Sequence, residues 1–290
     1  MSIIVTGATG QYGRAVTEQL LKVLPPEDLI LVTRKPERLA ALAARGAKVR
    51  KGDFDDPDAL PAAFEGGERM MLISTARVGR RVGQHGNAIA AAAKVGVRQI
   101  AYTSFIGLHL DNPALVTKDH RNTETLMRES GVAWTALRDS QYAEAAAEVI
   151  APMALASGKW FASAEDGRIA MVARQDCVAC AAAVLTTPGH DNTAYDITGP
   201  ELMSYAEICA MVGEIAGRAL EYVRVDDEGM RDMFDRAGVP REASDDMVSF
   251  ERAIREGHFA VISDSVQKLT GRPATPLREV LMAHKDKWPV

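Results

Sequence analysis

The feature that most constrains the fold is an alternation of short β-rich runs with helical patterns over the first half of the chain. The runs are IIVTG, LILVT, KVRKGD, MMLIS, QIAYTS and WTALR, which begin at residues 3, 29, 48, 70, 99 and 134. Strands that are apolar along their length and separated by helices form parallel βαβ units with both sheet faces covered. The sequence therefore predicts an α/β fold, a doubly wound parallel sheet.

The pattern changes after about residue 150. Residues 159–172 look like a hairpin that turns at residues 165–167, and the later chain is mostly short helices with capped starts. We expect the sheet domain over residues 1–150 and a smaller, mostly helical domain over residues 151–290. A late strand near residues 195–199 is expected either to return to the sheet or to stay with the second domain.

Composition narrows the class of protein. The 290 residues are 47% hydrophobic and 25% charged, as in an ordinary globular protein. A net charge of -5 with interspersed signs argues against a nucleic-acid partner, and three cysteines are too few for a disulfide framework. No signal peptide and no apolar stretch of about 18 residues is evident. We expect a cytoplasmic monomer or homodimer with no membrane or nucleic-acid partner and no metal.

A glycine-rich segment, TGATGQYG, follows the first strand and opens the first helix. In its GxxGxxG spacing the first glycine allows a tight turn, and the second lets the backbone approach a pyrophosphate. The third lets the helix pack closely on the strand. The phosphates would then lie at the positive end of the helix, as in a Rossmann dinucleotide site; a purely structural turn is the alternative. The candidate cofactor contacts are Gly7, Thr9, Gly10, Gln11, Tyr12 and Gly13.

The ends of the next strands indicate which dinucleotide is bound. An NAD site places Asp or Glu at the end of the second strand, where this chain has Arg34 and Lys35. These cations suit a 2′-phosphate, so we predict NADPH; a pair that only caps a loop is the alternative. Asp53, after the third strand, is a candidate acceptor for the adenine amino group. Small residues after the fourth strand would let the second ribose approach the backbone, namely Ser74, Thr75 and Ala76.

The chain resembles the NmrA-like group of atypical short-chain dehydrogenase/reductases over essentially its whole length. The likeness is carried by TGATGQYG, LVTRKPERL, KGDFDDP, AYTSFIG, WTALRDSQY and SDSVQKLTGRPATPLREVL. It looks most like the bacterial NADPH-dependent quinone oxidoreductases, triphenylmethane-dye reductases and flavin-free azo-dye reductases. Plant isoflavone and lignan reductases and NmrA redox sensors, which bind cofactor without turnover, also belong to the group. The resemblance implies a Rossmann domain and a small C-terminal domain, with substrate in the cleft between them.

The segment ALVTKDHRNTE stands where the wider superfamily has a Tyr-xxx-Lys pair, and it contains no tyrosine. Aligning on Lys118 puts Ala114 at the tyrosine position. Aligning on Glu124 puts Val116 there, with His120 at the lysine position. Isoflavone-type reductases carry a lysine six residues before a helical glutamate, which is the spacing of Lys118 and Glu124.

A helical wheel separates the two candidates for proton transfer. At about 100° per residue, His120 lies on the side of Met127 and Lys118 lies roughly opposite. If Met127 faces the core, His120 points inward, and Lys118 must reach back from the first turn. Both are candidate catalytic residues, with a solvated lysine and a buried structural histidine as alternatives. Ser104, after the fifth strand, is a third candidate because the superfamily keeps its active-site hydroxyl there; a strand-end cap is the alternative.

The missing tyrosine indicates the kind of acceptor. Reducing a ketone leaves a strongly basic alkoxide that needs a positioned acid, whereas reducing a quinone leaves a phenolate whose conjugate acid has a pKa of about 10. We therefore predict a flavin-free NADPH-dependent reductase that transfers hydride to a flat conjugated acceptor, a quinone or an azo or triphenylmethane dye. The alternatives are an NADPH/NADP-sensing regulator without turnover and an isoflavone- or lignan-type benzylic reductase.

The remaining candidates would contact the substrate. Gln141 and Tyr142 follow the sixth strand, where family members line the substrate pocket, and Trp160 is expected to pack against the cleft. For Tyr142, core packing is the alternative. Cys177 and Cys180 form a CxxC pair in an alanine-rich helical run, and buried small residues are expected there rather than a metal site.

Overall fold

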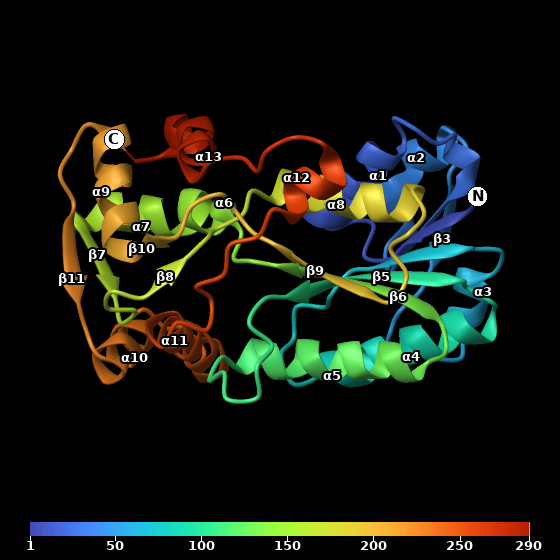
Figure 1. Cartoon of the computed structure of the whole chain (residues 1–290), viewed down its shortest axis with the longest axis horizontal. Coiled ribbons are helices and arrows are strands. Elements are labelled where there is room, and N and C mark those ends of the chain that lie inside the picture. Colours follow the sequence, from blue (N-terminus) through green and yellow to red (C-terminus); the bar gives the residue numbers. More distant parts are fainter. Residues whose placement is uncertain (290) are drawn as a thin grey trace. The chain divides into compact units, whose positions relative to one another are not determined.

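A computed structural model describes residues 1–289 and divides the chain into two compact units (Figure 1). Unit 1 comprises Met1–Ser104, Asp119–Arg138 and Cys177–Tyr195. Unit 2 comprises residues 105–118, residues 139–176 and the described residues from 196 onward. The predicted domains divide the chain at one point, near residue 150, whereas each of these units combines several segments.

The main sheet has seven strands, and the prediction of a doubly wound α/β fold is confirmed. The strand registers show that β1 runs parallel to both β2 and β4. Strand β2 also runs parallel to β3, and β4 runs parallel to β5. The late strand predicted near residues 195–199 lies at the edge of this sheet as β9. In spatial order the strands are β3 (Lys48–Lys51), β2 (Leu29–Thr33), β1 (Ile3–Val5), β4 (Arg69–Leu72), β5 (Gln99–Phe105), β6 (Ala133–Asp139) and β9 (Thr193–Ile197).

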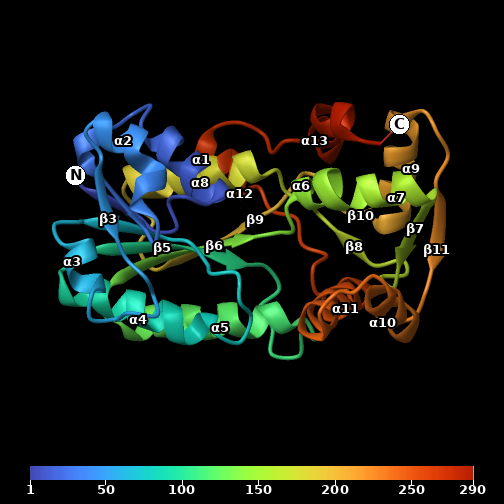
Figure 2. The same ribbon diagram turned by 180° about the vertical axis from the view of Figure 1, so that it is seen from behind.

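Helices cover both faces of the sheet, which explains why its central strands are apolar along their length. Every residue of β1 and β2 is buried. Figures 1 and 2 show helices against both faces. On one face lie α1 (Gln11–Leu20), α2 (Ala40–Ala44) and α8 (Arg174–Thr186), and on the other α3 (Leu60–Phe64), α4 (Arg81–Lys94) and α5 (Leu115–Glu129).

The strand order fixes the place of the site. Because the order reverses between β1 and β4, the loops that leave the carboxyl ends of these strands diverge and leave a crevice. The glycine-rich loop leaves β1 and the segment from Ile73 to Arg80 leaves β4. Both therefore border the crevice at this edge of the sheet.

Unit 2 is mostly helical, as predicted, with two small sheets beside the helices. Strand β7 (Lys159–Ala162) pairs in parallel with β11 (Glu221–Arg224), and β8 (Arg168–Ile169) pairs antiparallel with β10 (Met203–Ser204). No helix within residues 1–289 is both long and apolar enough to cross a bilayer. The helices are α6 (Ala143–Ala145), α7 (Ala151–Ser157), α9 (Tyr205–Ala216), α10 (Asp227–Arg236), α11 (Arg241–Arg255), α12 (Ser265–Thr270) and α13 (Leu277–His284).

The hairpin predicted over residues 159–172 is wrong. The chain does turn at Glu165, which has a positive φ of 50°, but β7 and β8 each pair with a strand from farther along the chain. After the turn, Gly167 packs so closely on α11 that an added Cβ would lie 2.2 Å from the Ile254 carbonyl oxygen. Contact with this helix replaces pairing between the two arms of the turn.

Candidate cofactor-binding site

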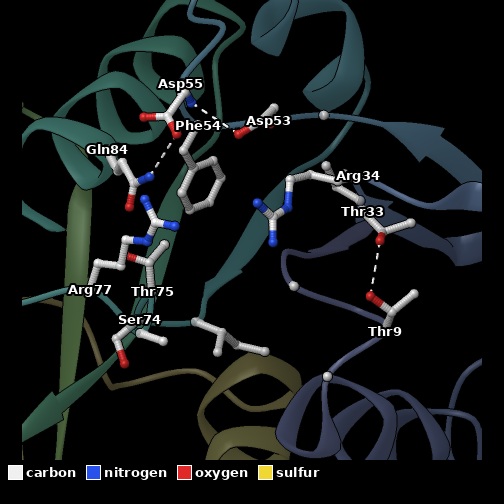
Figure 3. Close-up of a pocket in the computed structure, with 16 residues that line it drawn as sticks. Thr9, Thr33, Arg34, Asp53, Phe54, Asp55, Ser74, Thr75, Arg77 and Gln84 are labelled. Atoms are coloured by element: carbon white, nitrogen blue, oxygen red, sulfur yellow. Dashed lines mark hydrogen bonds between the residues drawn. The ribbon is translucent and has the colours of Figure 1, made fainter. Parts of the chain in front are cut away.

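A cavity of about 470 Å³ lies in unit 1 at the carboxyl ends of β1, β2, β3 and β4 (Figure 3). Its position at the reversal of strand order is where open α/β sheets bind ligands. It brings together predicted cofactor contacts from four separate strand ends. The lining residues are Gly7, Thr9, Gly10, Val32, Thr33, Arg34, Gly52, Asp53, Phe54, Asp55, Ile73, Ser74, Thr75, Ala76, Arg77 and Gln84.

Each of the three glycines in the loop has a different structural role. Gly7 has a left-handed φ of +58°, and its carbonyl oxygen accepts from the Gly10 N–H at 2.9 Å. An added Cβ at Gly13 would lie 2.4 Å from the Gly7 oxygen, so only glycine lets the helix pack this closely. At Gly10, which lines the cavity, an added Cβ would meet only that oxygen, at 3.3 Å. The N-terminal end of α1 thus faces the cavity with N–H groups suited to a phosphate.

Four predicted cofactor contacts lie outside the cavity lining. The Tyr12 hydroxyl donates to the Cys177 carbonyl oxygen at 3.1 Å and so ties α1 to α8, while Gly13 serves the packing of the loop. Gln11 and Lys35 have exposed side chains. As direct cofactor contacts, these residues stay predictions. The side chain of Cys177 is fully buried, as is that of Cys180, as predicted for small core residues.

Two arginines supply positive charge at the cavity. Figure 3 shows the guanidinium groups of Arg34 and Arg77 directed into it from β2 and from the segment after β4. Within residues 1–289, neither guanidinium has a hydrogen bond or an ion pair. By contrast, Arg80 lies 3.1 Å from Asp55, and Asp53 accepts from the Asp55 N–H at 3.1 Å. The guanidinium groups of Arg34 and Arg77 are therefore available to bind an anionic ligand.

The cavity wall also holds polar atoms without partners. The Thr75 Oγ1 and Gln84 Oε1 atoms are buried and make no hydrogen bond within the described part of the chain. Buried polar groups in proteins are normally hydrogen-bonded, so such atoms at a cavity indicate a polar ligand. Together with the glycine loop and the unpaired arginines, they fit a dinucleotide phosphate better than an apolar molecule.

Sequence reasoning missed part of this wall. Phe54 and Asp55 directly follow the predicted Asp53, so their position was a usable signal. Arg77 and Gln84 lie in and beyond the segment after β4, where no motif marks them. Only the fold brings these two residues to the strand ends.

The segment without tyrosine forms the first part of α5, and the helical wheel is confirmed. Met127 is fully buried and His120 is buried, whereas Lys118 is exposed. The Ser104 hydroxyl is buried and donates to Glu124 at 2.7 Å. Neither Ser104 nor His120 is among the residues that line the cavity. Their catalytic roles, and that of Lys118, stay predictions.

Glu124 is the centre of a cluster formed with Ser104, Arg128 and Arg138, in which two arginines share one buried carboxylate. Arg138 donates to its two carboxylate oxygens at 2.9 and 2.8 Å, and Arg128 donates at 2.7 Å. Burial alone would raise the pKa of Glu124, but the hydrogen bonds and charges of its partners outweigh burial and lower it. The carboxylate is therefore ionised and structurally engaged at neutral pH.

The predicted substrate contacts belong to unit 2. The Gln141 side-chain oxygen accepts from the Tyr205 hydroxyl at 3.2 Å, and the Tyr142 hydroxyl donates to Asp139 at 2.9 Å. Trp160 is only 2% exposed and packs in the core of the unit against Tyr205, with ring centroids 6.0 Å apart. Gln141 and Tyr142 are partly exposed and stay candidates.

Comparisons with known proteins agree with the site. A family model described as NAD(P)H-binding matches residues 7–188. Quinone oxidoreductase 2 of Escherichia coli is 35% identical over 278 residues, which cover 96% of each chain. The NAD(P)H azoreductase of Xenophilus azovorans is 30% identical over 289 residues, which cover 97% of each chain.

Solved structures extend the agreement to the fold. The E. coli NADPH-dependent quinone oxidoreductase QOR2 complexed with NADPH has a TM-score of 0.92 at 33% identity, covering 97% of this chain and 99% of that one. The Citrobacter sp. triphenylmethane reductase complexed with NADP(H) has a TM-score of 0.89 at 30% identity, covering 98% and 100%.

The fold, the cavity and these matches define an NAD(P)H-dependent oxidoreductase. The chain belongs to the NmrA-like NAD(P)H-binding family, and the resemblance noted from its motifs is confirmed.

Proposed function

We propose that the protein is a flavin-free, NADPH-dependent reductase that transfers hydride to a flat conjugated acceptor, a quinone or an azo or triphenylmethane dye. The observation that carries the proposal is Arg34, an unpaired guanidinium directed into the cavity where an NAD site has a carboxylate. The acceptor classes come from the relatives: a quinone oxidoreductase, an azoreductase and a triphenylmethane reductase. Quinones and azo and triphenylmethane dyes share an extended conjugated system, and this common chemistry defines the proposed substrate class.

The cavity residues have separate roles in this proposal. The N–H groups at the start of α1 would hold the pyrophosphate, and Arg34 would hold the 2′-phosphate with two parallel hydrogen bonds. The free oxygen of Asp53 would accept from the adenine amino group. Ser74, Thr75 and Ala76 would contact the second ribose. NADPH, when bound, supplies the hydride.

The chemistry of the acceptor determines whether the protein must supply a positioned proton donor. A reduced quinone or dye spreads its negative charge and exchanges protons with solvent, so a site without tyrosine suffices. We propose that Lys118 assists by stabilising developing negative charge and that Gln141 and Tyr142 contact the acceptor. The exposed ammonium of Lys118 suits this role better than the buried His120 ring.

The test is anaerobic NADPH oxidation by the purified protein without added flavin, over quinones, azo dyes, triphenylmethane dyes, a simple ketone and a benzylic ether. We expect turnover of the conjugated acceptors and at least about a hundredfold lower kcat/KM for the ketone. The Lys118→Ala variant should lose about tenfold or less on a quinone, because the product anion is already stable.

Three outcomes would contradict the proposal. Tight NADPH binding without oxidation by any acceptor would indicate a cofactor sensor. Turnover confined to the benzylic ether, with Lys118 indispensable, would indicate a benzylic reductase. Stoichiometric flavin in the active protein would show that hydride reaches the acceptor by another route.

A further inference from the structure

Both backbone polar groups of Thr75, a residue of the cavity wall, are held by side chains of α4. The Thr75 N–H donates to His85 Nε2 at 3.1 Å. The Thr75 carbonyl oxygen accepts from Arg81 Nε. Helix α4 thus holds the peptide groups on both sides of a residue that lines the proposed cofactor site.

The tautomer of His85 follows from its partners. Since Nε2 accepts from a backbone N–H, the neutral ring carries its hydrogen on Nδ1, which donates to Thr123 Oγ1 at 2.9 Å. The Thr123 hydroxyl gives its own proton to the Asp119 carbonyl oxygen at 2.9 Å. The imidazole of His85 is fully buried, and burial, followed by the charge of Arg81, lowers the pKa of His85 to about 3.

The second arm of the network starts at Arg81. Its Nη1 lies 3.3 Å from His120 Nε2, and a guanidinium can only donate, so this ring nitrogen accepts. His120 Nδ1 then donates to the Tyr102 hydroxyl at 2.8 Å. Burial, followed by the charges of Arg81 and His85, lowers the pKa of His120 well below its usual value.

Two arms of hydrogen bonds thus start at Thr75: one runs through His85 to Thr123, and the other runs through Arg81 and His120 to Tyr102. Both nitrogens of each histidine are hydrogen-bonded, so neither imidazole can turn without breaking a bond. The segment is tied a second time at Gly79, whose N–H donates to the Asp119 carboxylate at 2.6 Å.

We propose that Arg81 and His85 are positioning residues for the cofactor: they fix the Thr75 peptide groups and so preform the cavity wall of residues 74–77. His120 acts through its contact with Arg81 and not as a proton donor. This inference rests on the proposed binding of NADPH in the cavity. A wall that is already ordered lowers the entropy lost on binding and holds the cofactor in one orientation.

The test compares two replacements of His85. Leucine leaves the Thr75 N–H without an acceptor, whereas the oxygen of glutamine reaches the position of Nε2 and accepts from it. We expect His85→Leu to raise the Kd of NADPH about tenfold and that of NADH equally, since the 2′-phosphate contact is untouched. His85→Gln should stay within about threefold of the natural protein for both cofactors.

A matched control separates positioning from loss of stability. Thr135→Val removes buried hydrogen bonds with Gln99, 3.0 Å away, and with the His190 carbonyl oxygen, 2.7 Å away, at the amino end of β6. It should lower the Tm comparably and leave the Kd of NADPH unchanged. If His85→Leu does not fold, the Kd values are measured in Arg81→Lys instead. The guanidinium of Arg81 reaches both Thr75 and His120, and a lysine ammonium cannot replace both contacts.

The outcomes are distinguishable. No NADPH binding by the natural protein would refute the proposed function itself. Normal binding by the natural protein, with His85→Leu binding equally well or His85→Gln as weak as His85→Leu, would overturn the positioning role. A loss confined to NADPH would overturn it too, since that pattern belongs to a 2′-phosphate contact.

Discussion

The cofactor cavity and the Glu124 cluster, both in unit 1, each contain a pair of arginines in opposite environments. In the cavity, Arg34 and Arg77 have no anionic partner among the described residues. In the cluster, Arg128 and Arg138 both pair with one buried carboxylate. Unpaired arginines directed into a cavity suit an anionic ligand, whereas arginines that share a buried carboxylate contribute to the stability of the fold. Substitutions in the two regions should therefore separate binding from stability.

The largest expected effect is on stability, in the cluster. Glu124→Ala leaves Ser104 and Arg138 without their acceptor and should lower the free energy of unfolding by about 3 kcal/mol. Because the pKa of Glu124 is lowered on folding, its contribution is present at neutral pH and is lost as the pH falls through that lowered pKa. Urea denaturation at neutral pH measures the loss.

The cluster comparison has its own control. Arg128→Ala should cost less than about 1 kcal/mol, because the side chain of Arg128 is 42% exposed. Both variants should keep the Kd of NADPH while they remain folded. A selective loss of cofactor binding in Glu124→Ala at full stability would remove the contrast between the two regions.

The next effect is on binding, in the glycine loop. Gly10→Val places a side chain where the backbone must approach the pyrophosphate, and should raise the Kd of NADPH about a hundredfold. The variant should stay folded with a modest decrease in Tm, since the added Cβ meets only the Gly7 oxygen, in a close contact of 3.3 Å. Gly13→Ala, whose Cβ would lie 2.4 Å from the same oxygen, should lower the Tm more. Thermal shifts with and without NADPH measure both; unchanged NADPH protection in Gly10→Val would show that the loop is structural only.

The parts of the fold and site that follow local rules could be predicted from the sequence. Apolar runs between helical patterns predicted the main sheet. The glycine spacing and the strand ends predicted that Gly7, Gly10 and Arg34 lie on the cavity wall. The helical wheel gave the inward direction of His120. Each of these depends on neighbours in sequence or on a helix period, so no tertiary contact was needed.

What could not be predicted depends on contacts between distant segments. The hairpin failed because β7 pairs with β11, about 60 residues farther on by the register of Glu221 with Lys159. The hydrogen bond of His85 with Thr123 joins α4 to α5, and no spacing in the sequence shows that these two residues meet. Ser104 lies within β5, next to its last residue, rather than after the strand, and its partner Glu124 comes from helix α5.

The most direct test of the central claim is the ratio of kcat/KM for NADPH to that for NADH, with one quinone, in the natural protein and in Arg34→Ala. We expect a preference for NADPH that falls about tenfold in the variant while NADH is hardly affected, because one charge-assisted contact is lost. Arg80→Ala, which removes a nearby arginine already paired with Asp55, should change the ratio less than about threefold. Equal losses for both cofactors in Arg34→Ala, or a natural protein that prefers NADH, would contradict the account.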